Sequence, residues 1–239
     1  MESVTDIGSD VVALVRDAVH HYWEPNVVFG HGWDHAERIV RHAYWLAERE
    51  KCSASLACCS CYLIDAGLNI QRGRASHIER GIVIAREVIR RVLALGPHEE
   101  AIIEAISCHE GETDCSSCRF RESLVVHDAD TLDRLGATGI AMTMQYGRWI
   151  NRPFAANEDP LCVERNPELD GYTLDYIVYL GSLHKCLCTA GAARAALPKL
   201  REWQQFVSGL TAQVQEVRDL NYEVATRLLS TVCKTKAET

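Results

Sequence analysis

Apolar residues recur every three or four positions along most of this chain, and that spacing restricts its fold more than any other feature. The first such stretch follows Ser9, a residue type that often caps helices, and contains Val11, Val12, Leu14, Val15 and Val19. The same spacing predicts helices over 34–51, 53–66, 98–110, 121–135, 136–150, 172–190 and 198–232, and another that opens at a Ser76-x-x-Glu79 capping box. Neither an alternating strand pattern nor a repeat interrupts it. The sequence therefore predicts an all-α fold.

The 239 residues are enough for one sizeable domain, which we expect to span 1–239. Its motif-bearing core covers about 10–205, with the last helix over 198–232. A polar loop over 151–170 contains Pro153, Pro160 and Pro167. So long a loop is often a lid or a binding element.

The formal net charge of −8 argues against a nucleic-acid partner, because phosphate-backbone binding needs a concentrated basic face. A small anionic substrate is still compatible if a metal ion supplies positive charge. No run approaches the ~18 apolar residues of a membrane span, and the acidic start of the chain does not resemble a secretion signal. We expect a cytoplasmic protein without a membrane partner.

Eleven cysteines are many for such a chain, but the count is odd and the predicted location is reducing. Cys115 and Cys118 form a C-x-x-C pair without the second pair that a zinc ribbon needs. We therefore expect reduced thiols that are not required for folding.

Histidines and acids recur at helix ends. His31 and His35 flank the start of one predicted helix, Asp65 lies near the end of the next, and His77 and His109 begin and end later ones. Asp65 stands among small and apolar residues, where a carboxylate is costly to bury unless it is paired or coordinated. The alternatives are an exposed capping carboxylate for Asp65, a surface imidazole for His77, and a contact with the helix dipole for His109.

Three further acids, Asp128, Asp130 and Asp133, lie within six residues of one another and would repel unless a cation neutralises them. Asp128 and Asp130 are about 200° apart around a helix and cannot face one ion, whereas Asp130 shares a side with His127 and Asp133. The alternative is a solvated acidic face. Imidazoles and carboxylates on separate helices suit Mn, Fe, Ni or Co better than a thiolate zinc site.

This order of motifs resembles the HD superfamily of metal-dependent hydrolases, and most closely its small bacterial phosphohydrolase branch. That branch carries H-D-W-x-H, a later H-D doublet, and D-A-D-R-L-D. The first corresponds to His31-Gly32-Trp33-Asp34-His35, and the last to Asp128-Ala129-Asp130-Thr131-Leu132-Asp133. The resemblance spans about residues 10–205 and implies an HD-domain-like helical bundle.

By this resemblance the metal ligands are His35, Asp65 and Asp130. His77 and His109 match histidines that hold a second metal or contact phosphate, and Lys185 and Arg201 fall near substrate-binding cations. The chain departs from the family at the H-D doublet, which reads Ile64-Asp65, so the first site keeps one imidazole and two carboxylates. Cys61, one turn before Asp65, is expected in the core.

The resemblance implies a metal-dependent phosphohydrolase acting on a nucleotide or another small phosphate ester. Asp128, Asp133 or an imidazole would manage protons, and His31, Lys185 or Arg201 would offset phosphate charge. Two alternatives are open. One is a di-iron oxygenase of the same superfamily, for which His35, Asp65, His77, His109 and Asp130 supply five of six ligand positions. The other is a degenerate, non-catalytic HD domain that binds a ligand or partner. The sequence is also compatible with a homo-oligomer.

Overall fold

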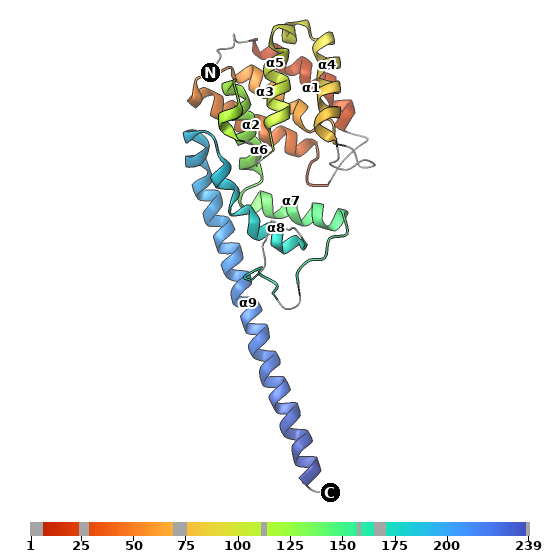
Figure 1. Cartoon of the computed structure of the whole chain (residues 1–239), viewed down its shortest axis with the longest axis vertical. Coiled ribbons are helices and arrows are strands. Elements are labelled where there is room, and N and C mark those ends of the chain that lie inside the picture. The colour runs from red at the N-terminus through yellow and green to blue at the C-terminus, as the bar shows by residue number, and fades with distance from the viewer. Residues whose placement is uncertain are drawn as a thin grey trace.

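A computed structural model describes residues 7–23, 29–68, 76–110, 114–156, 159–164 and 171–237, with side chains up to residue 217. Within these ranges it is helical and contains no strand, which confirms the predicted all-α fold (Figure 1). The helices are α1 (Ser9–Trp23), α2 (Trp33–Glu50), α3 (Ala54–Ile64), α4 (His77–Arg91), α5 (Glu99–Cys108), α6 (Arg121–Asp133), α7 (Gly136–Trp149), α8 (Thr173–Leu180) and α9 (Ala190–Ala237), with short 3-10 turns η2 (Leu93–His98), η3 (Cys115–Ser117) and η5 (Leu183–Cys186).

Two helices, α3 and α6, form the centre of the bundle, and α2 packs against both. Every side chain of α3 from Leu56 to Ile64 is buried, as is every side chain of α6 from Glu122 to Asp133. A solvated acidic face on α6 is therefore ruled out. Because α6 is covered on all sides, each of its polar groups has to be satisfied inside the protein.

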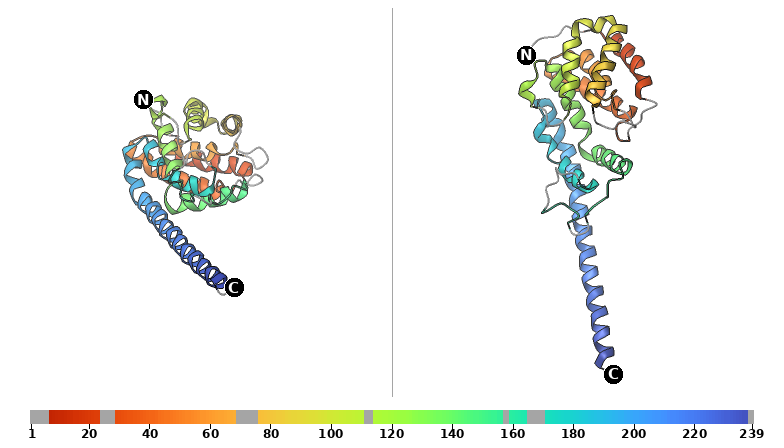
Figure 2. Two further views of the ribbon diagram at one scale, coloured as in Figure 1. Left: turned by 60° about the horizontal axis from the view of Figure 1, so that its bottom comes forward. Right: turned by 45° about the vertical axis from the view of Figure 1, so that its right-hand side comes forward.

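The end of the chain differs from the prediction. α8 stops at Leu180, and α9 starts at Ala190 and continues through Pro198 instead of beginning there. A Cβ on Gly181 would lie only 2.4 Å from the Trp203 ring, so the chain turns tightly against α9 at this point. The later part of α9 extends away from the body in every view (Figures 1 and 2). Self-association of the chain stays a prediction.

Other local predictions have mixed outcomes. α4 begins next to Ser76 as expected, but Ser76 has φ 57° and its side chain caps nothing, so the predicted capping box is wrong. The 151–170 loop is only partly described, and residues 157–158 and 165–170 lie outside the described ranges. Its first residues pack onto α8, where Pro153 and Phe154 carbonyls accept the amides of Thr173 and Leu174.

The contacts of Asp128 differ from those expected of a residue that transfers protons. Its carboxylate oxygens accept hydrogen bonds from the backbone amides of Cys188 and Thr189, both at 2.8 Å, and one oxygen lies 3.1 Å from His127 Nδ1. Asp128 is fully buried and fixes the start of α9. These contacts give Asp128 a structural role instead of the predicted proton-transfer role.

Replacing Asp128 should destabilise the fold. We expect Asp128→Ala to lower the free energy of unfolding by about 2–4 kcal/mol, because two amides and an imidazole lose a buried charged acceptor. Urea denaturation followed by circular dichroism measures this loss. An unchanged midpoint would show that the carboxylate does not hold α9.

The structure also corrects the expectation that all thiols are free, because Cys115 and Cys188 form a disulfide. The fold brings η3 against the segment before α9 and places their Cα atoms 5.6 Å apart, within the range that a disulfide spans. Cys118, the other half of the C-x-x-C pair, is buried and free. Burial raises the pKa of the Cys58 thiol to about 12, so this free thiol is unreactive at neutral pH.

Reducing the disulfide should lower stability. It closes a loop of 73 residues, so we expect Cys115→Ser to lower the free energy of unfolding of oxidised protein by about 2–4 kcal/mol. Cys118→Ser is the matched control, with a small effect. Thermal melts with and without dithiothreitol measure both. If dithiothreitol leaves the wild-type melt unchanged, the bond contributes nothing.

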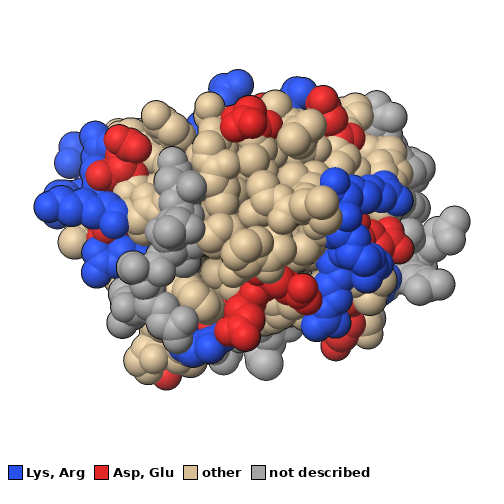
Figure 3. All heavy atoms as spheres, turned by 90° about the horizontal axis from the view of Figure 1, so that it is seen from above, with Lys and Arg blue, Asp and Glu red and all other residues tan. Residues whose placement is uncertain are grey.

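The surface carries charges of both signs. On the face seen in Figure 3, Lys and Arg side chains lie beside Asp and Glu side chains, around a central uncharged area. Among the described residues, no helix has the length and apolar character needed to cross a bilayer.

Candidate metal centre

His35 lies in the first turn of α2 and is fully buried. Its Nδ1 is 2.7 Å from Asp133 Oδ2, and Arg38 Nε and Nη2 contact the same carboxylate at 2.9–3.1 Å. A carboxylate beside Nδ1 favours the tautomer that keeps its proton there and directs the Nε2 lone pair inward. Asp133 was expected to manage protons, but this geometry makes it a residue that positions His35.

The other imidazole nitrogen, His35 Nε2, lies 3.3 Å from Asp130 Oδ1 and 3.5 Å from Asp65 Oδ2. It is buried and has no hydrogen bond of good geometry. A buried polar atom in this state needs an explanation, and a metal ion between one nitrogen and two carboxylates provides one. His35, Asp65 and Asp130 therefore place one nitrogen and two oxygens together as candidate ligands of a divalent metal ion.

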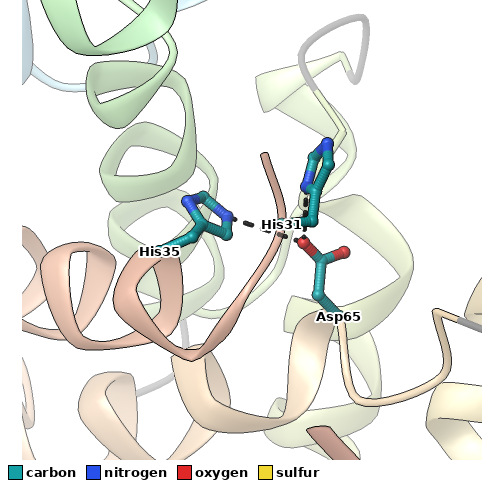
Figure 4. A group of neighbouring side chains, drawn as sticks. All are labelled: His31, His35 and Asp65. Atoms are coloured by element: carbon teal, nitrogen blue, oxygen red, sulfur yellow. Dashed lines mark hydrogen bonds and ion pairs between the residues drawn. The ribbon is translucent and has the colours of Figure 1, made fainter. Parts of the chain in front are cut away.

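Asp65 directly follows the last residue of α3 and is buried, so the alternative of an exposed capping carboxylate is wrong. Its Oδ2 lies 3.1 Å from His31 Nδ1 and 3.5 Å from His35 Nε2, and both rings turn toward this oxygen in Figure 4. Its Oδ1 lies 3.7 Å from His109 Nε2. Asp65 thus lies between two groups of imidazoles, with His31 and His35 near one oxygen and His109 near the other.

The second group of imidazoles, near Asp65 Oδ1, consists of His77 and His109. Both are buried, so neither is a surface imidazole. Their rings are 5.5 Å apart, and each offers a ligand atom within 4.8 Å of the other and of an oxygen of Asp65. His109 Nδ1 lies 2.7 Å from the Ile106 carbonyl, which leaves Nε2 directed at Asp65. This group could hold a metal ion bridged by Asp65. Whether these imidazoles bind metal or phosphate stays a prediction.

The protonation states show that the centre attracts positive charge. Burial opposes ionisation of Asp65 and Asp130, but the neighbouring imidazoles outweigh it and lower the pKa of both carboxyls, with Arg134 adding to the effect at Asp130. Burial also opposes protonation of His35, but the carboxylates of Asp130, Asp133 and Asp65 raise its pKa well above 6.5. A metal ion would supply the charge that protons supply here.

A cavity of about 190 Å³ adjoins His31. It is lined by α7, α8 and their flanks, with Arg134, Arg152, Tyr146 and Tyr176 on its walls. Arg134 donates from Nη2 to the Tyr176 hydroxyl at 2.5 Å, and its Nη1 is 3.7 Å from Asp130 Oδ2. The guanidinium of Arg134 therefore links the cavity to the carboxylate centre.

The sequence analysis did not identify these arginines, and the substrate-binding cations it named are Lys185 and Arg201. Lys185 on η5 and Arg201 on α9 are exposed and do not line the cavity, so they are not placed to contact a substrate there. Arg134 directly follows Asp133 in the D-A-D block, a position that could have identified it. Cys61 is fully buried in the core, as expected.

Comparisons with known proteins identify the fold. No protein-family model and no curated sequence matches the chain. A Lactobacillus plantarum protein of known structure is similar with a TM-score of 0.67 and 19% identity, covering 87% of this chain and 98% of its own. Bacillus subtilis YpgQ in complex with ADP has a TM-score of 0.62 and 19% identity, and the match covers 85% of this chain and 97% of YpgQ. A Bacillus thuringiensis HD-superfamily hydrolase has a TM-score of 0.60 and 19% sequence identity, and the match covers 86% of this chain and 95% of that hydrolase. The chain therefore has the HD-domain fold.

Proposed function

We propose that this protein is a metal-dependent phosphohydrolase acting on a nucleotide or another small phosphate ester. The observation that carries the proposal is the junction of two sites. A buried centre of imidazoles and carboxylates adjoins, at His31, a cavity with two arginines on its walls. Metal ions activate water and arginines bind phosphate oxygens, so the junction suits hydrolysis of a phosphate ester.

In this proposal His35, Asp65 and Asp130 hold an ion of Mn, Fe, Ni or Co. When bound, the ion lowers the pKa of a water molecule and polarises a phosphoryl oxygen. Asp133 and Arg38 keep His35 in the required orientation. Arg134 and Arg152 bind the phosphate in the cavity, where a planar guanidinium can donate two hydrogen bonds at once.

The substrate class has two supports. YpgQ, which shares the fold, was crystallised with ADP, a phosphate-bearing ligand. The cavity of about 190 Å³ is below the ~300–1,000 Å³ of pockets for drug-sized ligands, which favours the phosphate end of a substrate or a small ester. Tyr146 and Tyr176 on its walls offer aromatic faces for the remainder of the molecule.

A di-iron oxygenase is the second candidate, because Asp65 lies between two groups of imidazoles. A carboxylate in that position can bridge two ions, in an oxygenase or in a two-metal hydrolase. Purified protein with two irons per chain that consumes oxygen would favour the oxygenase. The two arginines of the cavity fit the anionic phosphate ester on which the proposed hydrolase acts.

The test is a screen of nucleoside mono- and triphosphates with added Mn²⁺, Ni²⁺ or Co²⁺, following release of phosphate and pyrophosphate. Elemental analysis of the same preparation measures bound metal. We expect metal-dependent release that a chelator abolishes and added metal restores. Release that is equally fast in chelator would contradict the mechanism. Bound metal without turnover would favour the oxygenase, and absence of both would favour a non-catalytic domain.

Metal binding should depend on pH. The raised pKa of His35 means that a proton occupies the imidazole at neutral pH and must leave before a metal ion binds. We expect apparent Mn²⁺ affinity to rise about tenfold per pH unit from roughly pH 6 upward, and to level off above that raised pKa. Isothermal titration calorimetry at several pH values measures the affinity. Repeating it in buffers of different ionisation enthalpy measures the number of protons released on binding. Affinity that is independent of pH would contradict a role for His35 as ligand.

A further inference from the structure

The metal centre lacks one imidazole at the position where the sequence motif calls for it. Ile64 stands immediately before Asp65, is the last residue of α3 and is fully buried in the apolar core. It offers no ligand atom. With His35, Asp65 and Asp130 alone, the proposed ion would have a single nitrogen ligand.

We infer that His31 supplies the missing imidazole and binds the metal ion through Nδ1, an inference that rests on the proposed function. His31 Nδ1 lies 3.1 Å from Asp65 Oδ2, the same oxygen that lies 3.5 Å from His35 Nε2. The three ligand atoms all lie within 4.8 Å of one another. Figure 4 shows the two rings approaching the carboxylate from different sides, His31 from the segment before α2 and His35 from the helix itself.

The spacing of these atoms matches a coordination shell. With metal–ligand bonds of about 2.1 Å, neighbouring ligand atoms are about 3.0 Å apart around an octahedral ion and about 3.4 Å apart around a tetrahedral one. The contacts of 3.1 Å from His31 to Asp65, 3.5 Å from Asp65 to His35 and 3.3 Å from His35 to Asp130 all fall close to these values. His31 thereby completes, with His35 and Asp65, a set of two nitrogens and one oxygen, and Asp130 Oδ1 lies beside His35 Nε2.

The backbone before α2 holds His31 in this place. Gly30 has φ +85°, and a Cβ there would lie 2.9 Å from the Met142 carbonyl, so the turn fits closely against α7. The ring of His31 packs edge-to-face on Tyr146 at 5.9 Å and on His35 at 5.4 Å.

His31 also lines the cavity and keeps 13% of its side chain exposed, unlike fully buried His35. The ion would therefore be reached by substrate on the side of His31. A substrate phosphate bound by the arginines would meet the metal ion past this imidazole.

The experiment must separate a metal ligand from a simple hydrogen-bond partner of Asp65. Glutamine can donate a hydrogen bond to Asp65 but is a poor ligand, so His31→Gln keeps the structural contact and removes the metal bond. His35→Gln is the positive control. His184→Gln is the matched negative control, because the Nδ1 of this half-buried His184 contacts the Gly181 carbonyl, and His184 belongs neither to the cavity lining nor to a described ligand group.

The full-length protein is stripped with chelator and titrated with one equivalent of Co²⁺. Proton NMR then counts the imidazoles bound to the ion, because the ring N–H signals of bound imidazoles are contact-shifted far more than those of neighbouring unbound rings; these are the shifted rings counted below. We expect two shifted rings in wild type and in His184→Gln, and one in His31→Gln with affinity lowered at least about 100-fold. Circular dichroism checks folding. His31→Asp, which restores an oxygen ligand, should recover affinity but still show one shifted ring.

Two shifted rings in His31→Gln, with wild-type affinity, would overturn the inference. If His35→Gln still lost Co²⁺ in that case, the proposed metal centre and function would stand without His31. If His35→Gln also bound Co²⁺ as wild type does, the proposed function itself would fail. The three outcomes are therefore distinguishable.

Discussion

We expect Asp130→Asn to abolish the proposed metal-dependent turnover, with kcat/KM lowered at least about 1,000-fold, because metal stabilisation of the transition state contributes several kcal/mol. Asp130 is buried, and its Oδ1 lies 3.3 Å from His35 Nε2. An amide of the same shape keeps the packing and removes the negative charge that holds the ion. Initial rates of phosphate release and the Mn²⁺ content of the purified variant measure the effect.

The matched control is Asp128→Asn, two positions earlier on α6. The hydrogen-bond partners described for the Asp128 carboxylate are the amides of Cys188 and Thr189 and the ring of His127, none of which belongs to the proposed metal centre. We expect this variant to lose stability but to keep its metal affinity and specific activity at low temperature. Equal activity of Asp130→Asn and wild type, both insensitive to chelator, would contradict the hydrolase mechanism.

The contrast between these aspartates shows how far the sequence could define the site. The helical period separates Asp128 from Asp130 by about 200°, so sequence alone predicted that only one of them faces a given ion. It also placed Asp130 on the side of Asp133, and both contact His35. The helical period does not show which other elements pack against each side of α6. Asp128 was given a catalytic role because nothing in the sequence shows that its side of α6 meets Cys188 and Thr189.

Elements distant in sequence account for the other differences. The resemblance implies Lys185 and Arg201 as substrate cations, but η5 and α9 leave both exposed. The Cys115–Cys188 disulfide joins residues 73 positions apart and depends on the turn between α8 and α9, which the sequence did not predict. His31 was recognised as part of a motif, but its contact with Asp65 requires the end of α3 to meet the segment before α2.

Arg134→Gln should have the second large effect on activity. The guanidinium lies at the C-terminal end of α6, with 14% of its side chain exposed on the cavity, 3.7 Å from Asp130 and bonded to Tyr176. A largely buried cation that has few solvent contacts is available for phosphate oxygens, and such charge-assisted hydrogen bonds are the strong ones. We expect kcat/KM to fall about 100- to 1,000-fold, the range seen when one charge-stabilising donor is lost.

Two readouts separate a phosphate-binding role from a structural one. Inhibition by inorganic phosphate should weaken in Arg134→Gln while Mn²⁺ affinity changes little, because His35, Asp65 and Asp130 are intact. Arg134→Lys should recover part of the activity, since an ammonium keeps the charge but cannot donate two parallel hydrogen bonds. Arg201→Gln, at the exposed position on α9, is the control and should match wild type. Undiminished phosphate inhibition in Arg134→Gln would exclude this arginine from the substrate site, and the phosphate would then have to be bound by Arg152 or by the imidazoles of His77 and His109.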